Sequence, residues 1–216
     1  MEALILFFVL FFPGVYSIGA YQAPEASIPF QELTELTRTL TYTLPAFALL
    51  WYIISDKKGF SALKQERIVK RDLIPFAAGF PGLILIGTGI SLLISYLSLN
   101  HSVTPPLKVE APAGIAGWMV MIASCLCTGY LEESFFRYYL LSNLEGSLPQ
   151  AILMVVFSTF LFSVCHIYEG PWGILNSALA GAMLSVLFIR FRSLHGIAWA
   201  HGAYNIAVYI MGNFSG

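Results

Sequence analysis

The sequence predicts an all-α protein, a polytopic transmembrane helical bundle with about seven spanning helices. Hydrophobic residues make up 57% of the 216 residues and charged residues only 11%, whereas an ordinary soluble domain is about 25% charged. The chain contains 17 Phe, and its mean hydropathy is +0.75. The apolar residues also gather in stretches near the ~20 residues that a helix needs to cross the hydrocarbon core.

Two spans are predicted before the first hydrophilic loop. Residues 1–20 are apolar apart from Glu2. The basic segment that opens a secretory signal peptide is missing, so we expect a spanning helix and not a cleaved leader. An acidic connector at 21–35 leads to the second span at 36–54. Pro45 lies inside this span, where a proline predicts a kink.

The loop at 55–72 predicts the orientation of the bundle. It holds six of the chain's eleven Lys and Arg, and basic loops stay on the cytoplasmic side of a membrane. With seven spans, the N-terminus is then cytoplasmic and the C-terminus lies on the opposite side. Docking of lipid or substrate is an alternative role for the loop, although topology alone accounts for its charges.

Five further spans are predicted after this loop. The fourth helix of the chain would be about 45 Å long at 1.5 Å per residue, so it must tilt, kink or project from the ~30 Å hydrocarbon core. We treat the chain as one integral domain, with N-terminal helices at 1–112 and a catalytic core, from the fourth to the seventh helix, at 113–216. The five predicted spans are residues 73–99, 113–143, 150–166, 172–189 and 194–211.

The composition argues against two other classes of protein. The net charge is −1 and no basic stripe exists outside the 55–72 loop, so the sequence predicts no nucleic-acid partner. Three cysteines is an odd number, and all lie in apolar runs. We therefore expect small buried hydrophobic side chains at Cys125, Cys127 and Cys165, and no disulfide framework.

Ionisable side chains inside the fourth helix are the strongest functional signal. Such groups cost several kcal/mol in a membrane unless they are paired or hydrated, so by default they indicate function. Glu133 and Arg137 are four residues apart and can neutralise each other on one helix face. Glu132 points elsewhere, toward Phe135 and Phe136, where an unpaired carboxylate suits a general base. The alternative is a Glu–Arg clasp that only holds helices together.

Two later helices carry polar groups of the types that hydrolysis needs. Phe162 and His166 share one helix face, as do His201 and Asn205, because each pair is spaced four residues apart. Each group alone fits a structural role, such as an interhelical hydrogen bond. Together with Glu132, they place a carboxylate, two imidazoles and an amide on three successive helical hairpins.

Several chemistries can be compared on these residues. A Gly-x-Ser-x-Gly elbow and a His-Glu-x-x-His helix are both absent from the sequence. Cys165 cannot use its neighbour His166 as a base, because adjacent residues point in different directions on a helix. Zinc held by Glu132, His166 and His201 remains open. Without a metal, the same groups suit activation of a water molecule and stabilisation of an oxyanion.

Three motifs in this order resemble those of the CAAX prenyl protease and bacteriocin-processing (CPBP, formerly Abi) family. They are Glu-Glu-x-x-x-Arg at 132, 133 and 137, Phe-x-x-x-His at 162 and 166, and His-x-x-x-Asn at 201 and 205. The resemblance extends from about Gly114 to Asn205. It implies an all-helical core around an intramembrane cavity and the activity of a glutamic intramembrane endopeptidase.

The resemblance also implies a role for each motif residue. Glu132 would be the base for the attacking water, and His166 would help to hold that water. His201 and Asn205 would form an oxyanion hole. Glu133, Arg137 and Phe162 would support the site.

Three functional readings follow from the sequence. The first is an intramembrane endopeptidase without a cofactor, the second a zinc-dependent metallohydrolase using the same residues, and the third a non-catalytic immunity or scaffold protein. For the first we expect a peptide or protein substrate, either prenylated or embedded in the bilayer. The small size and short connectors favour an integral protein of a prokaryotic cell (inner) membrane. The sequence does not predict the oligomeric state.

A bundle of straight helices would place the candidate catalytic residues at different depths in the membrane, too far apart to form a single site. Straight helices that begin at the predicted boundaries would place Glu132 about 16 Å, His201 about 10 Å and His166 about 25 Å from the inner surface. We therefore expect tilt, an unwound segment or a shifted fifth helix to bring His166 to the depth of Glu132.

Overall fold

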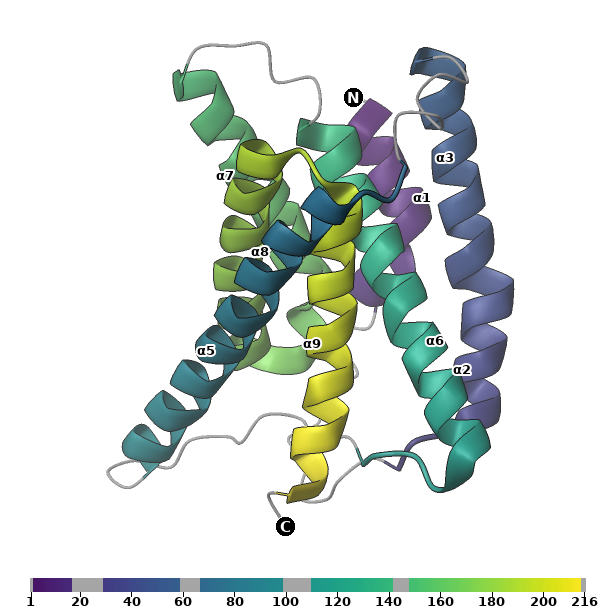
Figure 1. Ribbon diagram of the computed structural model, residues 1–216, viewed down its shortest axis with the longest axis vertical. Helices are drawn as coiled ribbons and strands as arrows, with labels where there is room; N and C mark the ends of the chain where they lie inside the picture. The colour runs from purple at the N-terminus through teal and green to yellow at the C-terminus, as the bar shows by residue number, and fades with distance from the viewer. Residues whose placement is uncertain (1, 17–28, 59–66, 99–109, 142–147, 215–216) are drawn as a thin grey trace.

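The structure, a computed structural model, describes residues 2–16, 29–58, 67–98, 110–141 and 148–214. Every regular element in these parts is a helix, so the predicted all-α membrane bundle is confirmed. Successive long helices run up and down the molecule, with the N-terminus at the upper end and the C-terminus at the lower end (Figure 1). The predicted ends of the first and fourth spans, at 20 and 143, lie outside the described residues, as does Lys64 of the basic loop.

The first half of the chain forms α1, one long interrupted helix, and α5. The interrupted helix passes through a π-helical segment, η2, immediately before Pro45, at the predicted kink. A proline ring clashes with the carbonyl four residues earlier, and the wide π turn changes the backbone geometry at that position. The bounds are α1 Glu2–Tyr16, α2 Glu32–Arg38, η2 Thr39–Thr43, α3 Leu44–Lys58, the 3₁₀ turn η3 Lys70–Asp72 and α5 Leu73–Ser98.

The second half forms the hairpins that carry the three motifs. The predicted long fourth helix is α6, continued by a π-helical segment, η4, directly after the two glutamates. The bounds are α6 Gly114–Glu133, η4 Ser134–Tyr139, α7 Leu148–Cys165, the 3₁₀ turn η5 Ile167–Glu169, α8 Gly170–Phe191 and α9 Leu194–Phe214.

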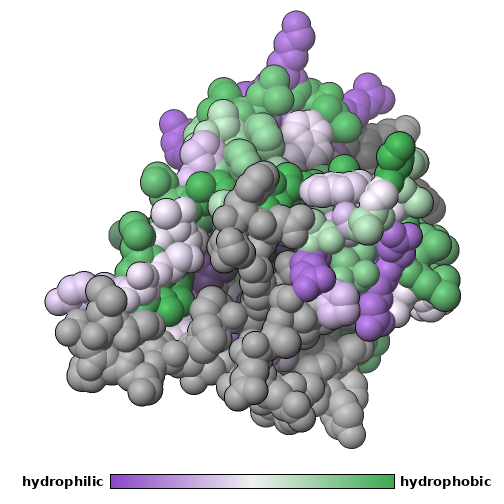
Figure 2. Space-filling model, turned by 90° about the horizontal axis from the view of Figure 1, so that it is seen from below, coloured by the Kyte–Doolittle hydropathy of each residue, from purple (hydrophilic) through white to green (hydrophobic). Residues whose placement is uncertain are grey.

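Four helices in the described parts are long and apolar enough to cross a membrane, compared with the seven predicted spans. They are residues 70–97, 114–139, 148–165 and 167–191. Large apolar side chains on these helices face outward, for example Leu85 at 72% exposure and Ile115 at 82%. Outward apolar side chains of this kind are the surface that lipid tails can cover. Figure 2 shows the end of the molecule seen from below, where hydrophilic side chains lie among hydrophobic ones.

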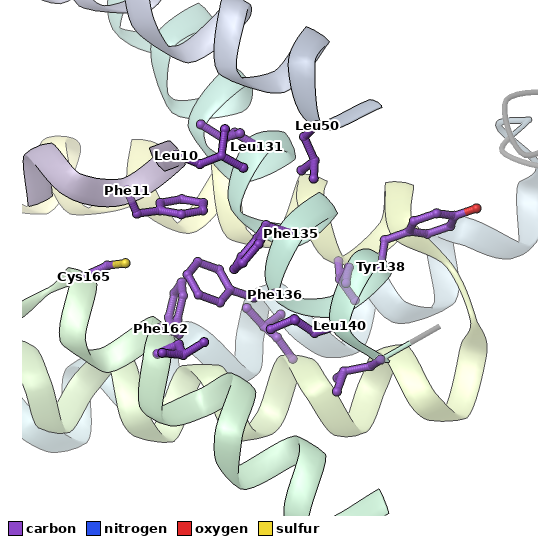
Figure 3. Close-up of a cluster of buried hydrophobic side chains, with 14 of the residues drawn as sticks. Leu10, Phe11, Leu50, Leu131, Phe135, Phe136, Tyr138, Leu140, Phe162 and Cys165 are labelled. Carbon is purple, nitrogen blue, oxygen red and sulfur yellow. The ribbon is translucent and has the colours of Figure 1, made fainter. Parts of the chain in front are cut away.

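An aromatic cluster fixes the position of η4 between α1 and α7. The ring centroids of Phe11 and Phe136 are 4.9 Å apart, and those of Phe136 and Phe162 are 5.2 Å apart. Phe135 packs on Phe11 at 5.2 Å. In Figure 3 the thiol of Cys165 points toward the same cluster. Aromatic pairs at these separations stabilise a core beyond the area that they bury, so the helix end that follows the glutamates is held firmly.

Helices α6 and α9 approach each other through two glycines. A Cβ atom on Gly129 would lie 3.0 Å from the carbonyl oxygen of Ala198 and 3.0 Å from the amide nitrogen of Gly202. A Cβ atom on Gly202 would lie 2.9 Å from a methyl group of Leu126. Small residues allow helix backbones to approach closely in membranes. This contact brings the glutamates of α6 next to His201 of α9.

The fifth predicted helix is shifted relative to its neighbours, as the depth of His166 required. In Figure 1 α7 begins above the upper ends of α8 and α9, and the turn between α7 and α8 lies near the middle of α9. The end of α7, which His166 follows in the sequence, therefore lies near mid-height of the bundle and not at its lower end. A shifted fifth helix was one of the three adjustments that the sequence led us to expect for His166.

Candidate active site

A fully buried ion pair forms the base of the site. Arg137 Nη1 lies 2.7 Å from Glu133 Oε1, and both side chains are 0% exposed. Arg137 Nη2 donates to the carbonyl oxygen of Gly181 at 3.2 Å. The guanidinium carbon lies 4.4 Å from the centroid of the Phe162 ring. The predicted Glu133–Arg137 pair is therefore present, and it joins η4 to α7 and α8.

His201 is oriented by the same glutamate. Its Nδ1 donates to Glu133 Oε1 at 2.8 Å, because a carboxylate oxygen in an ion pair can only accept. One carboxylate oxygen thus holds a guanidinium and an imidazole at once. The other ring nitrogen, Nε2, is left to face Glu132, with Oε2 of that residue at 3.6 Å.

Glu132 differs sharply from its neighbour in the sequence. Its Oε2 is buried and has no hydrogen-bond partner in the described part of the protein, which is also true of Glu133 Oε2, but Glu132 takes no part in the ion pair with Arg137. The side chain as a whole is 14% exposed, against 0% for Glu133. A buried carboxylate oxygen without a partner is costly unless it serves a purpose. The two adjacent glutamates therefore have separate environments, as their positions on the helix predicted.

Phe162 connects the second motif to this group. Its ring centroid lies 4.6 Å from that of His166 and 5.8 Å from that of His201. His166 Nδ1 donates to the carbonyl oxygen of Phe162 at 2.8 Å. That bond fixes the imidazole beyond the last turn of α7 and leaves its Nε2 unused by this contact.

Asn205 is the candidate that the structure leaves most separate. It lies one turn beyond His201 on α9 and is half-buried. Its amide makes no hydrogen bond to any residue that the structure describes, Glu132 and His201 included. Residues on one helix face four positions apart lie about 6 Å apart along the axis.

The site contains groups that the motifs did not indicate. The charge of Glu132 lies within electrostatic range of Arg38, Tyr42, Cys165 and Tyr168. Arg38 falls inside the predicted second span, where the rule that intramembrane charges indicate function would have selected it. The π turn of η4 was also missed. It places Phe136 so that its carbonyl oxygen accepts from Ser158 at 2.6 Å, and such turns are frequent at functional sites.

The zinc alternative can be compared with this geometry. Within the described ranges, no three His, Cys, Asp or Glu side chains lie close enough together to hold a metal ion. Glu132 and His201 approach each other, but His166 contacts the ring of Phe162 instead of joining them. In this conformation the residues do not form a three-ligand zinc site. All three cysteines are free thiols.

Comparison with known proteins identifies the part of the chain that holds the site. Residues 114–207 match the family model described as Type II CAAX prenyl endopeptidase Rce1-like, and this range includes all three motifs. No curated protein and no solved structure matches the chain. The family resemblance predicted from the motifs is confirmed. With its apolar helices, the chain is an integral membrane protein in which residues 114–207 are similar to the Rce1-like type II CAAX prenyl endopeptidase family.

Proposed function

We propose that this endopeptidase hydrolyses a peptide bond near or within the bilayer, with a water molecule that Glu132 activates. The observation that carries the proposal is the buried, unpartnered Oε2 of Glu132, 3.6 Å from Nε2 of His201. Glu133 Oε2 is also unpartnered, but we do not assign this role to Glu133, because its Oε1 accepts from both Arg137 and His201 and its side chain is 0% exposed. A carboxylate is able to act as a general base when it lies within reach of the water that it deprotonates.

The proposed reaction has two steps. Glu132 accepts a proton from water while the water oxygen attacks the peptide carbonyl carbon, which gives a tetrahedral oxyanion. The carbon–nitrogen bond then breaks, and Glu132 returns the proton to the leaving amine. Donors placed where negative charge develops stabilise such an intermediate, and His201 Nε2 and the Asn205 amide are the donors that we assign to this role. His166, held through Nδ1, presents Nε2 to the water.

The oxyanion role places a requirement on His201. Because Nδ1 donates to Glu133, Nε2 carries a hydrogen only in the imidazolium form. A carboxylate faces each ring nitrogen of His201, Glu133 at 2.8 Å and Glu132 at 3.6 Å. Glu133 and Arg137 thus act through His201, as positioning residues and not as groups that touch the reacting atoms.

A cleavage assay with purified protein in lipid vesicles tests this proposal. Glu132→Gln keeps the size of the side chain and removes the base, so we expect turnover to fall at least about 100-fold. The matched control is Glu110→Gln, because Glu110 is an exposed carboxylate outside the site. Hydrolysis at the normal rate by the Glu132 variant would refute the role of Glu132.

Two other readings are separated by their own measurements. We propose that the reaction needs no cofactor, so zinc should not accompany the purified protein and chelators should leave cleavage intact. Stoichiometric zinc with loss of activity on chelation would instead favour the metallohydrolase. A non-catalytic immunity or scaffold protein would show neither cleavage nor a catalytic effect of Glu132→Gln, only changes in stability.

For the substrate and the membrane, the proposal is as follows. The substrate is a peptide or protein, prenylated or embedded in the bilayer, and the membrane is a prokaryotic cell membrane. The upper end of the bundle carries the exposed side chains of Arg67, Lys70, Arg71 and Arg190, and it includes the N-terminal side of α1 (Figure 1). Because basic residues remain cytoplasmic, we assign this end and the N-terminus to the cytoplasm.

A further inference from the structure

Arg38 is the cation in the described residues that lies near Glu132 without being enclosed. Its side chain is 39% exposed, whereas that of Arg137 is 0% exposed. It is the last residue of α2, which lies beside the lower half of α6 in Figure 1. Its Nη2 lies 3.4 Å from the hydroxyl of Thr128, which is four residues before Glu132 on α6. Arg38 is thus placed to attract an anion toward the carboxylate that we assign as the base.

The known contacts of Arg38 use one edge of its guanidinium. Nε and Nη2 both donate to Glu35 Oε2, at 3.1 and 2.9 Å. Nη2 also donates to Ser124 at 2.8 Å and Thr128 at 3.4 Å. Nη1 makes a single long contact among the described residues, to Thr43 at 3.5 Å. A guanidinium has five N–H donors, so Nη1 retains donor capacity.

A polar stripe on α6 leads from Arg38 to Glu132. Ser124, Thr128 and Glu132 follow one another at intervals of four residues, so they lie on one face of the helix. Each step rises about 6 Å along the axis. The first two side chains contact Arg38. Ser124 is buried and donates to Glu35, whereas Thr128 and Glu132 are only partly buried, so a peptide could reach the guanidinium and the Glu132 carboxylate at this end of the stripe.

We propose that Arg38 is a specificity residue that binds a carboxylate of the substrate below Glu132, an inference that rests on the proposed peptidase function. Arginine N–H groups form charge-assisted hydrogen bonds with carboxylates, and Nη1 supplies them here, because Nε and Nη2 are already bonded. Glu35 occupies the opposite edge and competes for the same charge. The carboxylate has two sources, the C-terminus of the peptide or an acidic side chain.

Direct binding tests the inference apart from catalysis. The probe is a fluorescent apolar peptide in three forms, with a free C-terminal carboxylate, with a C-terminal amide, and with an amide plus one internal Asp. Binding is measured to protein carrying Glu132→Gln, in zwitterionic phosphatidylcholine vesicles. Arg38→Gln, Glu35→Gln and the control Arg190→Gln, at an exposed arginine of the upper end, are compared in this background.

Substitutions of Arg38 and Glu35 should change the affinity for a carboxylate peptide in opposite directions. Arg38→Gln should weaken binding of the carboxylate peptide about tenfold or more and leave the amide peptide unchanged. Glu35→Gln should strengthen carboxylate binding, because it removes the competing anion. Arg190→Gln should change neither. The Asp-containing peptide tells whether a side-chain carboxylate can replace the terminal one.

The opposite effects of Arg38→Gln and Glu35→Gln on carboxylate binding distinguish substrate recognition from a purely structural ion pair between α2 and α6. If Arg38→Gln and Glu35→Gln weaken all the peptides alike, or if carboxylate and amide bind equally to the parent protein, the inference is overturned. If Arg38→Gln does not fold, the effect of Glu35→Gln on carboxylate binding still tests the inference. If none of the peptides binds, the inference about Arg38 also fails. If the protein with Glu132 intact binds a peptide but does not cleave it, only the proposed function is refuted.

Discussion

At the scale of single residues, the protein gives adjacent glutamates different tasks. Glu133 accepts from Arg137 and His201 through one oxygen and is 0% exposed, while Glu132 lies outside this pair and is 14% exposed. The sequence predicted this separation, because Arg137 lies four residues after Glu133 and not after Glu132. It could not predict that His201 would bridge the two, since that contact depends on how closely α6 and α9 approach.

Removing Arg137 should destabilise the protein strongly. Arg137→Gln leaves Glu133 buried without its cation, and breaking a buried pair in this way costs about 3–5 kcal/mol. We expect the melting temperature in detergent to fall by about 10 °C. Arg190→Gln, at an exposed position, should leave it within about 2 °C. Equal melting of both variants would show that the buried pair does not hold the bundle together.

Phe162 should matter for both stability and activity. Its ring contacts Arg137, His166 and His201, so Phe162→Ala creates a cavity worth about 3–5 kcal/mol and releases both imidazoles. Turnover should fall by more than the loss of folded protein explains. Ile152→Ala on the same helix is the control, because Ile152 is 55% exposed. A variant that loses stability while the remaining folded protein stays fully active would contradict this role.

At the scale of elements, the helices and their motif-bearing faces were predictable. Long apolar runs set the spans, and four-residue spacing set which motif residues share a face. The π turns of η2 and η4 and the position of Arg38 were not predictable, because each depends on contacts between distant segments. The predicted second span, for instance, includes Arg38, but the sequence gives no indication that Ser124 and Thr128 accept hydrogen bonds from this side chain.

The contact between α6 and α9 can be tested at its glycines. Gly202→Val would push Leu126 away and separate Glu133 from His201, so we expect lower thermal stability and loss of turnover. Gly89→Val is the matched control, because a Cβ atom on this helical glycine would have no atom within 4 Å. Thermal melting and cleavage are measured on both variants. Normal activity of Gly202→Val would mean that close approach of the two helices does not position His201.

At the scale of the whole molecule, the charge distribution predicts how the bundle sits in the membrane. The exposed residues Arg67, Lys70 and Arg71 lie at the upper end, and the positive-inside rule assigns this end to the cytoplasm. A membrane-impermeant maleimide should therefore label Lys70→Cys in inside-out vesicles and not in sealed right-side-out vesicles. The unsubstituted protein gives the background from its own cysteines. The reverse pattern would invert the proposed orientation.

The division of labour between Glu132 and Glu133 is tested most directly by measuring turnover and melting temperature on the same purified samples. We predict that Glu132→Gln loses at least about 99% of turnover and melts within about 2 °C of the parent. Glu133→Gln should instead melt several degrees lower, because Arg137 loses its buried partner. A Glu132→Gln protein that keeps its turnover, or that unfolds like the Glu133 variant, would contradict the account.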